Sequence, residues 1–129
     1  GVGLGPGEGS IELCLQTEPG IELSLGSPLR ATIEVSRRGD LLLLPKTEIR
    51  LEARGGPSAT VEIPVRIAKL PAEVVEAEIV VTIHFMGCDA QDHTACVPGR
   101  VHARVPVRLI GQGGAGKLSF HVPLPALDV

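Results

Sequence analysis

Apolar and polar residues alternate with a period of two through most of the chain, which is the pattern of half-buried β-strands. Helical spacing is almost absent, and turn-forming segments interrupt the alternation at intervals of roughly 8–12 residues. The alternating segments are residues 11–16, 21–25, 29–35, 48–54, 60–67, 74–86, 100–110 and 118–122, with a continuous apolar run at 41–44. This pattern predicts an all-β sandwich of about seven to nine mostly antiparallel strands.

The two longest alternating segments, 74–86 and 100–110, flank a short loop and predict a long hairpin. With Cys88 opposite Cys96, an antiparallel register brings the apolar residues of both segments together, and a slip of one residue would separate them. The predicted apolar pairs are Val75–Leu109, Ala77–Val107, Ile79–Val105, Val81–Ala103 and Ile83–Val101. Glu76 then lies opposite Arg108, an ion pair worth about 0.2–1 kcal/mol.

The length of 129 residues is typical of one domain. Residues 1–10 are rich in glycine and predict a flexible linker or an artificial chain end, so the single β-sandwich domain is expected over 11–129. The chain has neither an initiator Met nor a signal peptide, and we expect it to be one domain of a longer protein. No apolar run reaches the roughly 18–20 residues that span a bilayer.

Composition narrows the classes of partner. A hydrophobic content of 43% favours a folded chain, and the net charge of −3 argues against nucleic acid or an anionic membrane as the main partner. With two aromatic residues, both Phe, the chain has little with which to stack bases. The core is therefore expected to consist of Val, Ile, Leu and Ala.

The loop between the long segments carries the candidate chemistry, because it holds Cys88, Cys96, His93 and two aspartates. Cysteines opposite one another on antiparallel strands lie within disulfide range. Strand parity places both on the less buried face, together with His84. One interpretation is a structural staple worth roughly 2–3 kcal/mol. The other is an accessible dithiol, with Arg100 or His93 favouring the thiolate.

Metal and nucleotide cofactors are the weaker alternatives. Cys88, His93 and Cys96 could bind zinc together with Asp89, Asp92, His84 or His102, but their spacing is not a common zinc signature. The segment 111–116 matches G-x-G-x-x-G, yet a strand-like pattern follows it where a dinucleotide site needs a helix. We therefore expect no metal and no small-molecule cofactor. Cys14 alternates onto the polar side of a strand and is expected to be an unreactive thiol partly covered by its neighbours, with an intermolecular disulfide as the alternative.

The hairpin resembles a known redox site. The run from Val81 to Ala90, then Cys96-Val97-Pro98 and the alternation that returns through Leu109, is similar to the active-site hairpin of DsbD-type thiol:disulfide interchange proteins. In the N-terminal periplasmic domain of that family, a strand enters Gly-Cys, a short loop follows, and Cys-x-Pro begins the returning strand. The resemblance implies an immunoglobulin-like fold, with Cys88 and Cys96 as the redox pair.

The same resemblance implies partners and location. It implies electron transfer between a thioredoxin-like protein domain and other periplasmic or extracytoplasmic proteins, without a cofactor, because the electrons travel through sulfur. It also implies a membrane or thioredoxin-like domain outside this chain. We therefore predict an extracytoplasmic thiol–disulfide exchange domain. The competing hypothesis is a non-catalytic structural or interaction module whose cysteines staple the hairpin or remain reduced.

Overall fold

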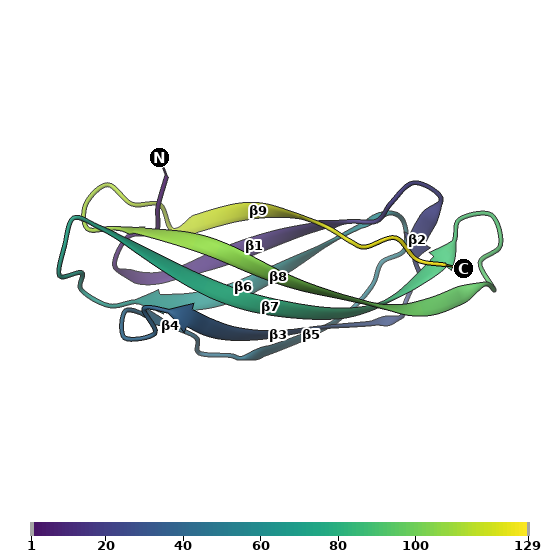
Figure 1. Cartoon of the computed structure of the whole chain (residues 1–129), viewed down its shortest axis with the longest axis horizontal. Helices are drawn as coiled ribbons and strands as arrows, with labels where there is room; N and C mark the ends of the chain where they lie inside the picture. Colours follow the sequence, from purple (N-terminus) through teal and green to yellow (C-terminus); the bar gives the residue numbers. More distant parts are fainter. Residues whose placement is uncertain (1, 129) are drawn as a thin grey trace.

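Two β-sheets pack face to face in the computed structural model, which describes residues 2–128 (Figure 1). The strands are β1 (Gly7–Gln16), β2 (Ile21–Leu23), β3 (Pro28–Arg37), β4 (Leu42–Leu43), β5 (Glu48–Glu52), β6 (Ser58–Ile67), β7 (Val74–Asp89), β8 (Cys96–Ile110) and β9 (Lys117–Pro123). One sheet has the order β4-β6-β1-β9, and the other has the order β2-β7-β3-β5 with β8 paired to β7. The predicted all-β sandwich is confirmed.

The β7–β8 hairpin runs the length of the molecule, with its loop at one end (Figure 1). Val75 pairs with Leu109, Ile83 pairs with Val101, and the register continues without a break to Cys88 and Cys96. Glu76 Oε1 accepts a hydrogen bond from Arg108 Nε at 2.9 Å. The predicted register is therefore correct throughout: the alternation excludes a slip of one residue, and the placement of Cys88 opposite Cys96 selects among the registers that remain.

β8 pairs along one edge of β7, and two other strands pair along its opposite edge. β3 pairs with residues 78–84 of β7, and β2 pairs with Gly87–Asp89. Between these two ladders, Phe85 and Met86 have no strand beside them on this side among the described residues. This interruption in the strand pairing leaves a hollow on the surface, on the side of the disulfide.

The core lies between the sheets and consists almost entirely of aliphatic side chains. Burial alternates along the strands, so Ile11, Leu13 and Leu15 of β1 are at most 1% exposed while the intervening residues are not buried. Phe85, 4% exposed, adds the one fully packed aromatic ring among the described residues. In residues 2–128, no helix is long and apolar enough to cross a membrane.

The N-terminal segment belongs to the sandwich from Leu4 onward, although the sequence predicts a linker through Ser10. Leu4 is 1% exposed and forms bridges with Leu109 and Ala115. Its amide donates to the carbonyl of Arg108, and its carbonyl accepts from the amide of Ile110, both at 2.8 Å. Burial of one leucine contributes about 1.5–3 kcal/mol, which explains why this Gly-rich stretch is ordered.

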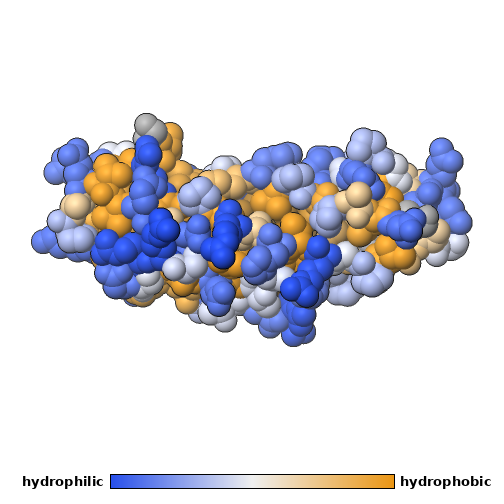
Figure 2. All heavy atoms as spheres, viewed as in Figure 1, coloured by the Kyte–Doolittle hydropathy of each residue, from blue (hydrophilic) through white to orange (hydrophobic). Residues whose placement is uncertain are grey.

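β8 and β9 are edge strands of different sheets and lie at the open edge of the sandwich. No ladder joins these two strands among the described residues. A groove of about 380 Å³ lies there, lined by Val101, Ala103 and Phe120 among others. Figure 2 shows apolar surface between charged side chains over the part of the face where β8 and β9 run in Figure 1. The edge is thus partly apolar although the molecule is acidic overall.

Candidate functional site: the disulfide at the tip of the β7–β8 hairpin

Cys88 and Cys96 form a disulfide with an S–S distance of 2.10 Å and a Cα–Cα distance of 4.0 Å. Cys88 is near the end of β7 and Cys96 begins β8, and the two residues lie opposite one another in the ladder. One residue further, the amide of Asp89 donates to the carbonyl of Ala95 at 2.9 Å. The pairing predicted from strand parity is therefore present, and the hairpin backbone holds both cysteines in place.

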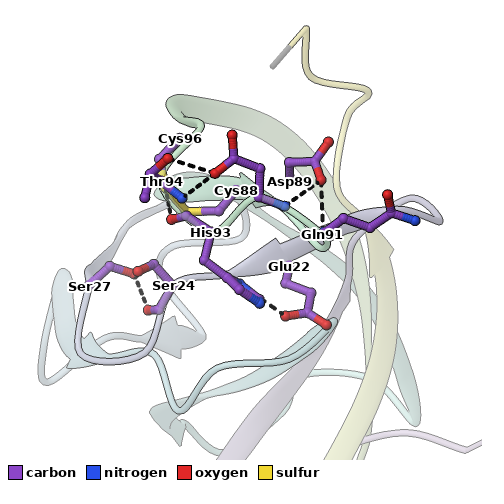
Figure 3. Close-up of a disulfide and its surroundings, with 10 residues drawn as sticks. Glu22, Ser24, Ser27, Cys88, Asp89, Gln91, His93, Thr94 and Cys96 are labelled. Carbon is purple, nitrogen blue, oxygen red and sulfur yellow. Dashed lines mark hydrogen bonds and ion pairs between the residues drawn. A yellow bond between two sulfur atoms is a disulfide. The ribbon is translucent and has the colours of Figure 1, made fainter.

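The two sulfur-bearing residues differ sharply in exposure. Cys88 is 1% exposed, whereas Cys96 is an exposed residue (Figure 3). The prediction that both lie on a less buried face is thus wrong for Cys88. The reason is β2, which pairs alongside and puts Glu22 opposite Cys88, so that Cys88 has a strand on each side. Cys96 lies on the outer strand, and no other described strand covers it.

Two aspartates fold the loop that joins the cysteines (Figure 3). The Asp89 Oδ1 atom accepts the amides of Gln91 at 2.8 Å and Asp92 at 2.9 Å. The Asp92 Oδ1 atom accepts the hydroxyl of Thr94 at 2.6 Å and its amide at 3.1 Å. These are Asx-type turns, in which a short acidic side chain replaces a backbone acceptor. Both carboxylates therefore serve the loop conformation.

The same contacts lower the pKa of both aspartates. The amides of Asp92 and Gln91 lower the pKa of Asp89, and the hydroxyl and amide of Thr94 lower the pKa of Asp92. In each case hydrogen bonds to the charged form favour that form. The pKa of each aspartate is therefore lower in the folded protein than in the unfolded chain. The stabilisation by these hydrogen bonds is fully present at pH values above the unfolded pKa, and it is lost as the pH falls through the folded pKa.

We predict that the loop keeps its hydrogen bonds down to a pH below 3.8, the ordinary pKa of an aspartate. Amide chemical shifts of Gln91 and Thr94, followed by NMR during acid titration, should report midpoints below that value. The amide of Leu124, which donates to the carbonyl of Gln16, provides a reference outside the loop. Midpoints at or above 3.8 would show that the carboxylates are not held by these amides.

The His93 side chain points toward Glu22, with Nδ1 at 3.9 Å from Oε2, and it is 70% exposed (Figure 3). Its carbonyl oxygen lies 3.2 Å from Sγ of Cys96. A disulfide sulfur carries no proton, so this contact becomes a hydrogen bond only after reduction, when the Cys96 thiol can donate. The hypothesis that the imidazole favours a thiolate gains no support, because the ring lies against Glu22.

The position of Arg100 also gives no support to the hypothesis that it favours a thiolate. It pairs with His84, four residues along β8 from Cys96. Four residues of extended strand correspond to about 13 Å. The guanidinium therefore lies over a different part of the face, beside His84 of β7.

The candidate metal ligands do not come together. Within residues 2–128, no group of three or more His, Cys, Asp or Glu side chains is placed to hold a metal ion. His102 Nδ1 lies 2.8 Å from the hydroxyl of Thr82, and His84 lies between Arg30 and Arg100 in the sheet. The segment 111–116 connects β8 to β9, so a strand follows it, as the sequence predicts.

Two glycines near the cysteines, Gly87 and Gly99, are closely packed by other side chains, a feature that sequence reasoning missed. A Cβ on Gly99 would overlap the ring of Phe85, and a Cβ on Gly87 would overlap the side chain of Leu127. Phe85 and Gly99 are directly opposite in the ladder. The predicted register already places an aromatic residue across from a glycine, and that pairing is the signal that could have identified this contact.

Cys14 is the free cysteine and lies on β1, in the sheet that does not carry the disulfide. Its thiol donates to Oε1 of Glu12 at 3.6 Å. Burial, followed by the neighbouring Glu12 carboxylate, raises the pKa of this thiol. A raised pKa reduces the thiolate fraction, and with it the reactivity. Cys14 forms no disulfide with either of the other two cysteines of the chain.

The molecule therefore offers one sulfur site of distinct geometry, a disulfide with one covered and one open cysteine at the tip of a rigid hairpin. Comparison with known proteins gives no match, either among protein-family models or among curated proteins.

Proposed function

We propose that this chain is a thiol–disulfide exchange domain in which the Cys88–Cys96 pair alternates between disulfide and dithiol. The observation that carries the proposal is the unequal exposure of the two cysteines at the hairpin tip. Exchange needs a sulfur that an incoming thiolate can reach, and Cys96 offers one. It also needs a second sulfur held nearby to resolve the intermediate, and the hairpin register holds Cys88 there.

Reduction begins when a partner thiolate attacks Sγ of Cys96, and the bond to Cys88 breaks. Cys88 leaves with the electron pair of that bond and takes up a proton. The partner's second thiol loses its proton and attacks the partner sulfur of the mixed disulfide, which releases Cys96 as a thiolate that is then protonated. Two electrons and two protons have moved, leaving a dithiol here and a disulfide in the partner. The reverse sequence reduces another protein.

The proposed setting is extracytoplasmic, because disulfides of this kind persist in oxidising compartments. A thioredoxin-like domain is the proposed donor, and other extracytoplasmic proteins are the proposed acceptors. This part rests on the hairpin residues that resemble the DsbD-type site, from Val81 through Leu109. A domain that supplies electrons, either membrane-bound or thioredoxin-like, completes the proposed system.

The reduction potential of the Cys88–Cys96 pair tests the proposal. We expect a value between about −270 and −120 mV, the range of thioredoxin-fold exchange proteins. The protein is equilibrated with glutathione and separately with thioredoxin, and the thiols are then alkylated and counted by mass spectrometry. A Cys14→Ser background removes the free thiol from the count without touching the pair.

A structural bridge is the second candidate, and the burial of Cys88 together with the turn hydrogen bonds of Asp89 favours it. In that case the disulfide only stabilises the hairpin. A potential below about −300 mV, with no exchange with thioredoxin, would establish the structural role and refute the exchange proposal.

A further inference from the structure

Four basic side chains form a line across the outer face of the sheet that carries the disulfide. Arg50 of β5 is opposite Arg30 of β3, Arg30 is opposite His84 of β7, and His84 is opposite Arg100 of β8. The alternating inner neighbours of these residues are buried or half-buried, so all four point outward. We call this line, Arg50–Arg30–His84–Arg100, the cationic row.

The cationic row is not neutralised by its surroundings. Glu48 is its one acidic contact among the described residues, at 3.8 Å from Arg30 and 3.3 Å from Arg50. No ion pair involves Arg100 in residues 2–128. Elsewhere on β8, Arg104 pairs with Glu78 and Arg108 pairs with Glu76, each at 2.9 Å. The row thus concentrates positive charge on a chain whose net charge is −3.

This arrangement works against the stability of the sheet. Like charges directly opposite one another on neighbouring strands are destabilising. Arg30 and Arg50 share one carboxylate, Glu48, and Arg100 has no acidic partner among the described residues, so the row keeps uncompensated positive charge, which is expected at functional sites. The row is therefore better explained by an external anionic partner than by a role in folding.

A hollow of about 330 Å³ adjoins the row, on the side of the disulfide. It is lined by Pro28, Leu29, Arg30, Arg50, Leu51, His84, Phe85 and Met86. The hollow exists because β3 leaves β7 at His84 and β2 joins it only at Gly87. An apolar recess thus opens directly beside a line of guanidinium groups.

Size decides what kind of ligand fits. Three inter-strand steps separate Arg50 from Arg100, about 14 Å at the usual strand spacing, so one small anion cannot reach the whole row. The hollow is open to solvent and would leave a small molecule largely exposed, whereas small-molecule sites usually enclose their ligands. A protein segment spans the row and covers the hollow.

We propose that the cationic row and its hollow bind an acidic segment of a partner protein, in which an apolar side chain accompanies two or more carboxylates. The carboxylates pair with the planar forks of the guanidinium groups. The apolar side chain of the partner fits against Phe85 and Met86. The flexible thioether of Met86 adapts to side chains of different shape. Four residues of β7 separate His84 from Cys88, about 13 Å, so a docked segment that extends about four residues further reaches the disulfide.

This inference rests on the proposed function for the role of the docked partner. Binding of the partner segment can nevertheless be measured without thiol–disulfide exchange. The probe is a fluorescein-labelled peptide of six glutamates with a central leucine, titrated with the oxidised protein and followed by fluorescence anisotropy at low ionic strength. The same peptide with glutamine in place of glutamate is the charge control. Binding should weaken as salt is added, because exposed charges are screened.

The double variant Arg30→Gln with Arg100→Gln should weaken peptide binding about tenfold, from two exposed charge contacts. The matched control is Arg66→Gln with Arg108→Gln, which removes the same charge from positions paired with Glu8 and Glu76. The control should bind as the original chain does. Without peptide, the Arg30–Arg100 variant should melt at nearly the same temperature as the original chain, because Arg30→Gln removes both the repulsion from Arg50 and the exposed ion pair with Glu48.

Equal weakening in both double variants would overturn the inference, since total charge alone would then explain binding. Full competition by millimolar inorganic phosphate would also overturn it, by showing a site for free anions. Peptide binding without thioredoxin exchange leaves this inference standing and refutes the proposed function. If the Arg30–Arg100 variant exchanges with thioredoxin as fast as the original chain does, and the peptide does not bind, the proposed function stands and this inference is refuted.

Discussion

In a Cys14→Ser background, we expect the Cys88→Ser variant to react with a thiol reagent about 100-fold faster than the Cys96→Ser variant under native conditions. The first variant leaves exposed Cys96, and the second leaves Cys88, which is 1% exposed and lies between β2 and β8 in the sheet. A buried thiol reacts only after local opening, and an opening free energy of about 2.8 kcal/mol gives this ratio. Stopped-flow measurement with an aromatic disulfide reagent reads both rates directly.

The same pair of variants tests the direction of exchange. Each variant is first converted by the aromatic disulfide reagent to its mixed aryl disulfide and then mixed with a thioredoxin variant that lacks its resolving cysteine, whose thiolate displaces the aryl thiolate. The activated Cys88→Ser variant should form a stable mixed disulfide with thioredoxin, and the Cys96→Ser variant should form little of it. In denaturant the two cysteines should react at the same rate, which provides the control. Equal rates in the native state would contradict the assignment of Cys96 as the attacked sulfur.

The second large effect concerns the glycine opposite Phe85. Gly99→Ala is expected to lower the free energy of unfolding by about 1–3 kcal/mol, because overpacking a filled site displaces side chains or backbone. The added methyl group would overlap the Phe85 ring, which is itself 4% exposed and cannot move outward freely. Denaturant titration, followed by far-UV circular dichroism, measures the change.

Gly116→Ala serves as the matched control, since a Cβ there meets no atom within 4 Å. That substitution should leave the unfolding midpoint nearly unchanged. Adding Phe85→Leu to Gly99→Ala should recover part of the loss, since the smaller side chain leaves room for the methyl group. A Gly99→Ala variant as stable as the original would mean that the ring does not occupy this position.

The hairpin and its disulfide illustrate what is encoded locally. The two segments are adjacent in the sequence, each has a clear period of two, and the parity of their apolar residues excludes a slip of one residue. Once Cys88 is placed opposite Cys96, the register is fixed and the Glu76–Arg108 ion pair follows from it. The function does not follow with them, because a structural and an exchangeable disulfide have the same pattern in sequence.

Tertiary structure decided everything that depends on distant segments. The burial of Cys88 comes from β2, more than sixty residues earlier in the chain, and the ordering of Leu4 comes from its bridges to Leu109 and Ala115. The cationic row exists only because β5, β3, β7 and β8 align Arg50, Arg30, His84 and Arg100. By itself, the sequence determined the strands, the hairpin register and the cysteine pair, since these depend on alternation between neighbours. Which sulfur is open and where charge gathers depended on the order and offset of strands across the sheets, and local alternation carries no information about either.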